Sequence, residues 1–382
     1  MTLLFRILFA LFLLLFFAKG QGDVLIRLFS SLFDTLLPPQ PWLWGSLLTL
    51  VWLGALALVQ RAFPRSRRAA VISHTFAVWF AVALVSVPFA GLWHQLALAA
   101  VGAALAVVFV RLAPRPVPAC PVSLSHRRLW CSFWKVNLSE LLWLTSLCVY
   151  AGLGAAASDT DHYELRTAQA LRSTPEDAYR VGERSLATTP RLFALRCRLM
   201  ASERAGLGET LFEQPVPPRV SASMLIPSES FSPADYPADS LYAFLQTPRR
   251  TGEKALDYFQ RCAHRAGMKP GPAADYYLCA LLLERRLERF VAALRCVYPD
   301  GDRAGHRLPR FYAQAVILHQ KRRTNPTWHY KDNAMSENYR DYSEMGDTLS
   351  SVRHRYNLLR RSYGNTYWWF YDFATALNAQ TK

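Results

Sequence analysis

The feature that most constrains the fold of this chain is a series of long apolar segments in its first 157 residues. Each segment approaches the roughly 20 residues that an α-helix needs to cross a bilayer, and Arg6 is the only interruption of the first. The segments cover residues 2–18, 42–60, 69–92, 93–110 and 141–157. They predict a bundle of four to five transmembrane helices, and they exclude a purely soluble enzyme.

The charged side chains divide at the same point of the chain. Residues 1–157 carry 12 Lys and Arg and 3 Asp and Glu side chains, whereas residues 158–382 carry 32 and 25. The second part therefore has the charge content of an ordinary water-soluble domain. We expect a transmembrane anchor at residues 1–157, in contact with the lipid bilayer, followed by a soluble domain at residues 158–382.

Basic residues between the apolar segments predict the orientation, because Lys and Arg collect in cytoplasmic loops. The connection near residues 92–95 has no basic residue. The connections before and after it are basic, with Arg61, Arg65, Arg67 and Arg68 on one side and Arg111, Arg115, Arg127, Arg128 and Lys135 on the other. This pattern predicts a cytoplasmic N-terminus and an extracytoplasmic domain at residues 158–382.

The first apolar segment is either a transmembrane anchor or a cleaved signal peptide. We favour an anchor, because Phe16 and Phe17 place large rings where a signal peptidase requires small residues. After this segment, residues 24–37 form an amphipathic pattern that stops at Pro38 and Pro39. This helix is expected either to lie on the outer membrane surface or to be buried at shallow depth between the spans.

Transport proteins keep ionisable groups inside their spans, because such groups are costly there unless they act on an ion or substrate. His74 is the only ionisable residue that we expect well inside the apolar segments. We interpret this histidine as a packed, hydrogen-bonded residue, which disfavours ion-coupled transport.

The soluble part has the apolar spacing of helices, and no alternating strand pattern is present. Residues 175–208 predict a helical hairpin of 34 residues, the length of a tetratricopeptide unit, and residues 272–298 predict a second pair. The proline-rich residues 214–239 are either an ordered irregular loop or a mobile linker. The expected helices are 161–172, 175–187, 190–205, 250–266, 272–284, 286–298, 308–322, 346–362 and 365–378. We predict an all-α protein with degenerate, tetratricopeptide-like hairpins.

No motif for catalysis, a cofactor or a metal is found. The sequence lacks phosphate-binding, zinc-protease and nucleophile-elbow motifs, and it has no CxxC pair. Asp159 and Asp161 are interpreted as helix-capping residues. In apolar helical stretches a free cysteine behaves as a small hydrophobe, and this describes Cys197, Cys262, Cys279 and Cys296. We predict no catalytic residue, no cofactor and no metal ligand.

Two stretches near the C-terminus are rich in aromatic and basic residues. Six of the seven residues from Tyr367 to Phe373 are aromatic. We interpret this helix first as part of the core, and alternatively as a surface for a glycan, a lipid headgroup or a protein partner. The candidate interaction residues are Arg310, Phe311, Tyr312, Arg360, Arg361, Tyr367, Trp368, Trp369 and Tyr371.

Four stretches of the soluble part carry a resemblance to a known group of proteins. They are residues 208–214 (GETLFEQ), 281–284 (LLLE), 308–312 (LPRFY) and 363–368 (YGNTYW). The chain resembles uncharacterised multi-pass inner-membrane proteins of Bacteroidota that carry a domain of unknown function. The resemblance implies a location in the bacterial inner membrane with a periplasmic helical domain, and it implies no activity.

The first hypothesis is a membrane-anchored scaffold whose helical hairpins bind another protein of the cell envelope. The alternative is a subunit or enzyme of envelope lipid or glycan processing or transport. A pocket that combines carboxylates with His264, His319 or His354 would favour the alternative, and a solvated groove without that cluster would favour the scaffold. The extracytoplasmic location argues against nucleic acid as a partner.

Overall fold

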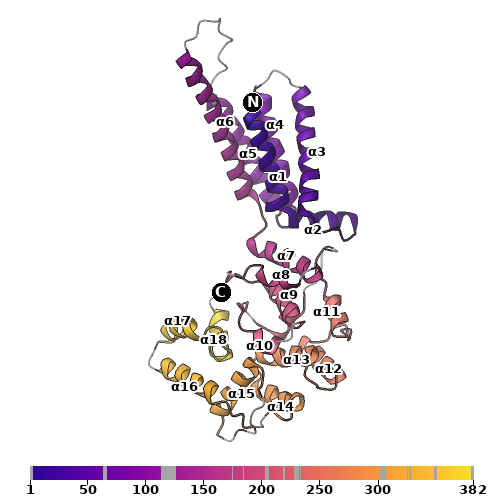
Figure 1. Cartoon of the computed structure of the whole chain (residues 1–382), viewed down its shortest axis with the longest axis vertical. Coiled ribbons are helices and arrows are strands. Elements are labelled where there is room, and N and C mark those ends of the chain that lie inside the picture. The colour runs from indigo at the N-terminus through magenta and orange to yellow at the C-terminus, as the bar shows by residue number, and fades with distance from the viewer. Residues whose placement is uncertain are drawn as a thin grey trace. The chain divides into compact units, whose positions relative to one another are not determined.

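The computed structural model describes residues 3–62, 67–112, 126–173, 175–183, 185–202, 206–217, 220–227, 232, 234–301, 307–324, 326, 328–347 and 351–379. Every regular element in these ranges is helical, which confirms the all-α fold class (Figure 1). The chain divides into two compact units. The first comprises Met1–Leu165 with Ser232–Ala234, and the second comprises Arg166–Phe231 with Asp235–Lys382.

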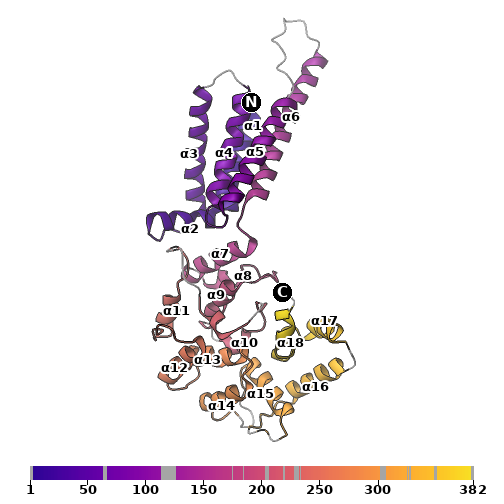
Figure 2. The ribbon, with the colours of Figure 1, turned by 180° about the vertical axis from the view of Figure 1, so that it is seen from behind.

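The first unit is a bundle of apolar helices. Its elements are α1 (Leu3–Leu15) with a π-helical turn (Phe16–Gly20), α2 (Gly22–Phe33), α3 (Pro41–Ala62), α4 (Arg67–Ser86), α5 (Leu92–Leu112), α6 (His126–Gly154) and the start of α7 (Asp159–Ser173). In Figures 1 and 2, α3 to α6 run side by side. The helices long and apolar enough to cross a membrane are Leu3–Gly20, Pro41–Ala62, Arg68–Ser86, Leu92–Arg111 and Trp134–Gly154. This finding confirms the prediction of several membrane-spanning helices.

Close packing holds this bundle together, because the hydrophobic effect does not drive helices together in lipid. On α3, a Cβ at Gly45 would lie 2.6 Å from the α-carbon of Ala18, so the two backbones approach as closely as glycine allows. The fully buried Trp143 stacks on Phe109 with 4.5 Å between the ring centres. The sequence places small and aromatic residues where these helices meet.

His74 and Glu140 are buried inside the spans. The ring of His74 packs edge-on against Phe5 and Phe9, and its Nδ1 donates to the Ala70 carbonyl over 2.6 Å. This arrangement agrees with the interpretation of His74 as a packed residue. Glu140 is also buried, within the span Trp134–Gly154. The expectation that only His74 lies inside is therefore wrong, because the last span begins several residues before the charge-free segment.

Helix α2 is buried at its start and exposed at its end. In its first turns, Val24 and Leu25 are buried in the core of the bundle. At its end, Leu32 and Phe33 are 71% and 59% exposed. The helix stops at Phe33, because Asp34 adopts a left-handed conformation with φ of 50°. The apolar residues of α2 thus pack into the bundle at the start of the helix and are exposed at its end.

The second unit contains shorter helices, most of which pack around a large apolar core. They are α8 (Pro175–Arg180), α9 (Pro190–Met200), α10 (Leu207–Thr210), α11 (Ala238–Phe244), α12 (Ala255–Arg265), α13 (Pro272–Leu283), α14 (Leu287–Val297), α15 (Arg310–Arg322), α16 (Asn333–Asp347), α17 (Val352–Tyr363) and α18 (Tyr367–Ala379). Every residue of α13 from Tyr276 to Leu283 is buried, so this helix lies at the centre of the core.

Several helix boundaries differ from the predicted ones. Residues 175–187 are helical only as far as Arg180, because Gly182 has φ of 65°. The predicted cap of that helix, Thr174, lies outside the described residues. Helix α9 begins with Thr189, whose side chain accepts a hydrogen bond from the Leu192 N–H over 3.1 Å. The first hairpin is therefore less regular than its length predicts.

The last helix, α18, belongs to the core. Tyr367, Trp368 and Phe373 are buried. Gln314 on α15 holds the start of the helix in two ways: its Oε1 accepts from the Tyr367 N–H, and its carbonyl accepts from the Trp368 indole N–H, both over 2.8 Å. This geometry agrees with the first interpretation of the aromatic stretch.

The described part of residues 214–239 is ordered against the same core. A short 3₁₀ turn, Ala222–Leu225, buries its first and last side chains there. The thiols of Cys197, Cys262 and Cys279 are free and buried, and Cys296 is free and exposed. The four cysteines are therefore free thiols and form no disulfide bonds.

Candidate functional site

An arginine-rich groove lies in the second unit where the turn between α13 and α14, the end of α15, and α18 meet. Its volume is about 420 Å³. The lining residues are Arg285, Arg286, Leu287, Glu288, Arg289, His319, Arg322, Arg323 and Tyr371. We call this feature the arginine groove.

Arg285 enters the groove from a strained backbone position. It follows α13 and has φ of 56°, in the left-handed region that glycine favours. The Arg285 N–H donates to the Leu282 carbonyl and the Arg286 N–H donates to the Leu281 carbonyl, which is the hydrogen-bond pattern of a Schellman turn. A non-glycine residue there costs about 1–2 kcal/mol. The position therefore favours a function for the arginine side chain.

Two guanidinium groups lie over the ring of Tyr371. The central carbon of Arg322 is 4.7 Å from the centre of its ring, and that of Arg285 is 5.1 Å away. Asp372 fixes Arg322 through an ion pair of 2.5 Å, and its other oxygen accepts from the Tyr342 hydroxyl over 2.7 Å. The core thus positions Arg322 through Asp372, and α18 supplies both the ring and the carboxylate.

Glu288 binds two other residues that line the groove. Its Oε1 pairs with Arg323 at 2.5 Å, and its Oε2 accepts from His319 Nε2 over 3.2 Å. Partial desolvation raises the pKa of Glu288, but the hydrogen bonds from His319 and Arg323 outweigh it and hold the pKa below the ordinary value. The other nitrogen of His319, Nδ1, is buried and has no hydrogen-bond partner among the described residues.

Positive charge exceeds negative charge in the arginine groove. Five arginines meet three carboxylates, those of Glu284, Glu288 and Asp372. Among the described residues, neither Arg285 nor Arg289 has an ion-pair partner. Guanidinium groups bind carboxylate and phosphate oxygens in pairs of parallel hydrogen bonds. The groove is therefore suited to an anionic ligand with planar or tetrahedral oxygens.

The nine candidate interaction residues do not form one surface in the structure. Phe311, Tyr312, Tyr367, Trp368 and Trp369 are buried. Arg310 forms an ion pair of 2.9 Å with Glu213, and Arg360 and Arg361 are exposed at the end of α17. Tyr371 alone of the nine lines the arginine groove.

The arginines of the groove were missed because their sequence signal is ordinary. Arg285–Arg286 and Arg322–Arg323 are doublets that follow apolar helices, where basic residues commonly interact with the last carbonyls. Nothing in the local sequence says that the two doublets meet. Within the described residues, no cluster of His, Cys, Asp and Glu is arranged to hold a metal ion.

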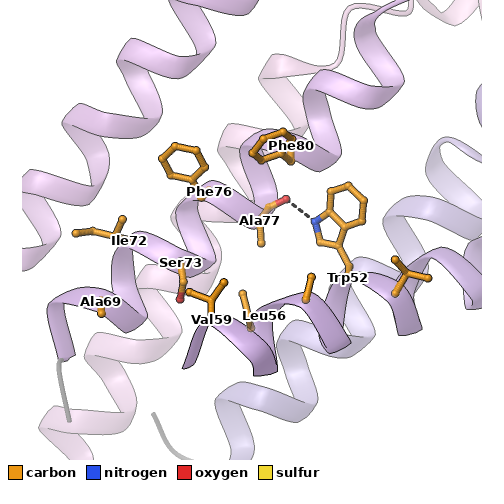
Figure 3. A pocket seen from close by; sticks show the side chains of 11 residues that line it. Trp52, Leu56, Val59, Ala69, Ile72, Ser73, Phe76, Ala77 and Phe80 are labelled. Atoms are coloured by element: carbon orange, nitrogen blue, oxygen red, sulfur yellow. Dashed lines mark hydrogen bonds between the residues drawn. The ribbon is translucent and has the colours of Figure 1, made fainter. Parts of the chain in front are cut away.

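A larger apolar groove, between α3 and α4, offers little chemistry (Figure 3). Its volume is about 590 Å³. The Trp52 indole N–H donates to the Ala77 carbonyl over 2.7 Å, and the Ser73 hydroxyl donates to Ala70. The polar groups of its wall are thus occupied within the protein, and the rest of the lining is hydrocarbon.

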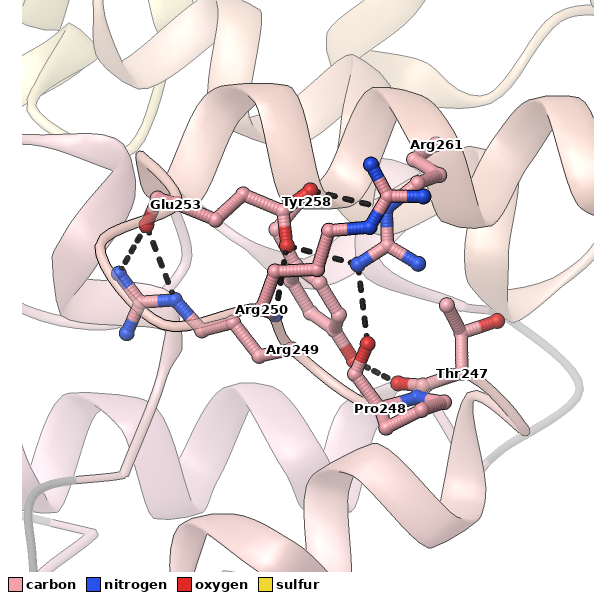
Figure 4. A network of polar contacts seen from close by, with 7 residues as sticks. All are labelled: Thr247, Pro248, Arg249, Arg250, Glu253, Tyr258 and Arg261. Carbon is pink, nitrogen blue, oxygen red and sulfur yellow. Dashed lines mark hydrogen bonds and ion pairs between the residues drawn. The ribbon is translucent and has the colours of Figure 1, made fainter.

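A third feature, a polar network before α12, has a structural role (Figure 4). Arg261 binds Glu253 through two hydrogen bonds of 2.7 and 2.8 Å, and these bonds hold the pKa of Glu253 at about 2. Arg249 and Arg250 also bind Glu253, through its carbonyl and its carboxylate respectively. The network closes the turn at residues 247–254 and starts the helix.

Fold and groove together define a class: an all-α protein with several membrane-spanning helices and an arginine-rich helical domain. Residues 263–374 match a family of unknown function, DUF6057. Every residue that lines the arginine groove falls inside the matched range. No curated protein and no solved structure matches the chain.

Proposed function

We propose that this protein is a membrane-anchored scaffold whose arginine groove binds an acidic segment of another protein of the cell envelope. The observation that carries the proposal is that Arg285 and Arg322 both lie over the Tyr371 ring, in a groove where arginines outnumber carboxylates. Arginine and tyrosine are enriched where proteins bind one another, because both bury a large surface and still form hydrogen bonds.

The contacts of His319 favour binding over catalysis. His319 contacts one carboxylate, Glu288, and that carboxylate is already shared with Arg323. The other ring nitrogen of His319 is buried and its side chain is only 3% exposed, so His319 is not placed to exchange a proton with a ligand in the groove. The groove therefore supports the scaffold better than the processing enzyme.

The location is part of the same proposal. Arg61 ends α3, Arg68 lies at the start of α4 and Arg111 lies at the end of α5, as expected for cytoplasmic ends. With five spans, this orientation directs the second unit to the periplasm of a bacterial inner membrane. We further propose that its paired helices form a degenerate tetratricopeptide-like array, as in the Bacteroidota proteins that the sequence resembles. Reaction of Arg67→Cys with a reagent that stays outside intact cells would contradict the orientation.

Site-specific photo-crosslinking in native membranes tests the proposed partner. A photoreactive residue replaces Lys321, which is exposed and precedes Arg322. The matched control carries the same residue at the exposed Glu337 on α16. We expect a protein adduct from position 321 only. The double variant Arg285→Glu/Arg322→Glu should abolish that adduct, because reversing both charges repels an acidic segment.

Two outcomes would overturn the scaffold. Adducts that persist in the charge-reversed variant would show that the groove does not bind the partner. Recovery of lipid or glycan adducts alone from position 321 would favour envelope lipid or glycan processing.

A further inference from the structure

A second groove, between α4 and α5, differs from the apolar groove of α3 and α4 because arginines line one of its ends. Its volume is about 530 Å³. Arg68 from the start of α4 and Arg111 from the end of α5 lie at the same end, since the two helices are consecutive and antiparallel. Side chains such as Phe76, Trp79 and Ala103 line the remainder.

The length of this groove matches one leaflet of a bilayer. Arg68 and Trp79 are eleven residues apart on α4, which corresponds to about 16 Å along a helix axis. The hydrocarbon of one leaflet is about half of the roughly 30 Å of a bilayer core. An acyl chain that starts beside the arginines would therefore end near Trp79.

Among the described residues, no acidic side chain pairs with these arginines. The sequence contains no Asp or Glu between Asp34 and Glu140, a stretch with nine Lys and Arg residues. In the described part of the chain, no ion pair involves Arg68 or Arg111, and both are exposed. Basic pockets between membrane helices bind anionic headgroups through this kind of uncompensated charge.

We infer that the groove between α4 and α5 is a binding site for one anionic phospholipid. The phosphate lies between Arg68 and Arg111, and an acyl chain follows the apolar wall of this α4–α5 groove past Ala103 to Trp79. The charge of the arginines selects anionic over zwitterionic headgroups, and the apolar wall excludes a free phosphate. This site is independent of the arginine groove and of its proposed partner.

Native mass spectrometry of the full-length protein in detergent tests the inference. Phosphatidylglycerol and phosphatidylcholine with identical acyl chains are added separately, and the bound fraction is followed with lipid concentration. We expect tighter binding of one phosphatidylglycerol. The double variant Arg68→Gln/Arg111→Gln should weaken phosphatidylglycerol binding by about 30-fold and leave phosphatidylcholine binding unchanged. Arg61→Gln, outside the groove, is the charge control.

A second pair of variants tests the apolar part. Ala103→Leu fills the groove, whereas Ala104→Leu adds the same volume at the next exposed position, which does not line it. We expect weaker phosphatidylglycerol binding for Ala103→Leu only, and no competition from soluble glycerol phosphate.

Four results would each overturn the site. Equal affinity of the wild-type protein for the two lipids would remove the role of the charge. A preference that survives the loss of both arginines would place the lipid elsewhere. Equal effects of the two leucine variants, or competition by glycerol phosphate, would show that no acyl chain occupies the groove.

Discussion

Gly208 packs against the ring of Tyr312 at the position where any other residue would carry its Cβ. A Cβ at Gly208 would lie 2.7 Å from Cζ of the Tyr312 ring, and the ring is fully buried. The Tyr312 hydroxyl donates to Asp275 Oδ1 over 2.8 Å, so the ring cannot move without breaking a buried hydrogen bond. The glycine is therefore a packing requirement of the core.

The first prediction is that Gly208→Ala destabilises the second unit by about 1–3 kcal/mol, because the added methyl group overpacks the core. Chemical unfolding of residues 158–382, followed by circular dichroism, measures the loss. Gly346→Ala is the matched control: its Cβ would lie 3.5 Å from Leu359, an ordinary contact, and alanine favours a helix. A Gly208→Ala protein as stable as the Gly346→Ala protein would contradict the packing argument.

The second prediction is that residues 158–382, expressed alone, form a soluble α-helical domain that needs no metal. The charge content of this part and its single large core support the expectation. Circular dichroism should show helical minima, and a chelator should leave the melting temperature unchanged. A strand-dominated spectrum, or a melting temperature that falls with chelator, would show that the prediction is wrong.

The third prediction separates stability from binding at Arg285. Arg285→Gly relieves the left-handed backbone, so the free energy of unfolding should stay within about 1 kcal/mol of wild type or rise. The same change removes one guanidinium from Tyr371 and should weaken binding of a polyglutamate peptide, measured by calorimetry.

Two controls accompany Arg285→Gly. Gln246→Gly relieves the same backbone strain, at φ of 50°, without touching the groove. Arg265→Ala removes one exposed charge from α12. If either control weakens peptide binding as much as Arg285→Gly, the binding is unspecific.

The fourth prediction concerns pH. Burial raises the pKa of Asp275 from 3.8 to about 6, although the hydrogen bond from Tyr312 acts in the opposite direction. The folded state thus binds the proton more tightly than the unfolded state. The contribution of Asp275 to stability is therefore greatest below about pH 4, falls as the pH rises to about 6, and is constant above that.

Asp275→Asn removes this titration. Its stability relative to wild type should rise by roughly 2–3 kcal/mol between pH 4 and pH 7. Urea unfolding at each pH measures the difference, with the exposed Asp257→Asn as control. A difference that does not change with pH would contradict a raised pKa.

The fifth prediction distinguishes the core and surface residues of α18. Trp368→Ala should cost about 3–5 kcal/mol, because the ring is 1% exposed and its N–H binds Gln314. Tyr371→Ala should cost no more than about 1 kcal/mol, and it should abolish the adduct from position 321. Unfolding experiments and crosslinking yields on the same variants give both readouts. Equal destabilisation by the two substitutions would place Tyr371 in the core as well.

The membrane helices and the aromatic core could be predicted from sequence because their signals are local. An uninterrupted apolar segment of about 20 residues predicts a membrane span from its length and composition alone. The six aromatic residues of 367–373 favour burial in the same way. Helix α16, by contrast, is largely polar, and its Tyr339 and Tyr342 are recognised as core contacts only because they pack against Trp368.

The arginine groove could not be predicted, because it depends on three distant segments. Arg285, Arg322 and Tyr371 lie on different helices or turns, and each has an ordinary local explanation. A basic residue after a helix is common, and Tyr371 could be named as a candidate interaction residue only as one member of an aromatic stretch. Only the packing of α13, α15 and α18 reveals that their charges and rings meet.

The place of α18 in the core has a consequence for the synthesis of the protein. Because Gln314 on α15 awaits Tyr367 and Trp368, the second unit cannot complete its core until α18 has left the ribosome. The helices made before α18 therefore lack these two hydrogen bonds until synthesis has passed Trp368. If the second unit is extracytoplasmic, as we propose, this late completion of the core favours a chain that can still be unfolded while it crosses the membrane.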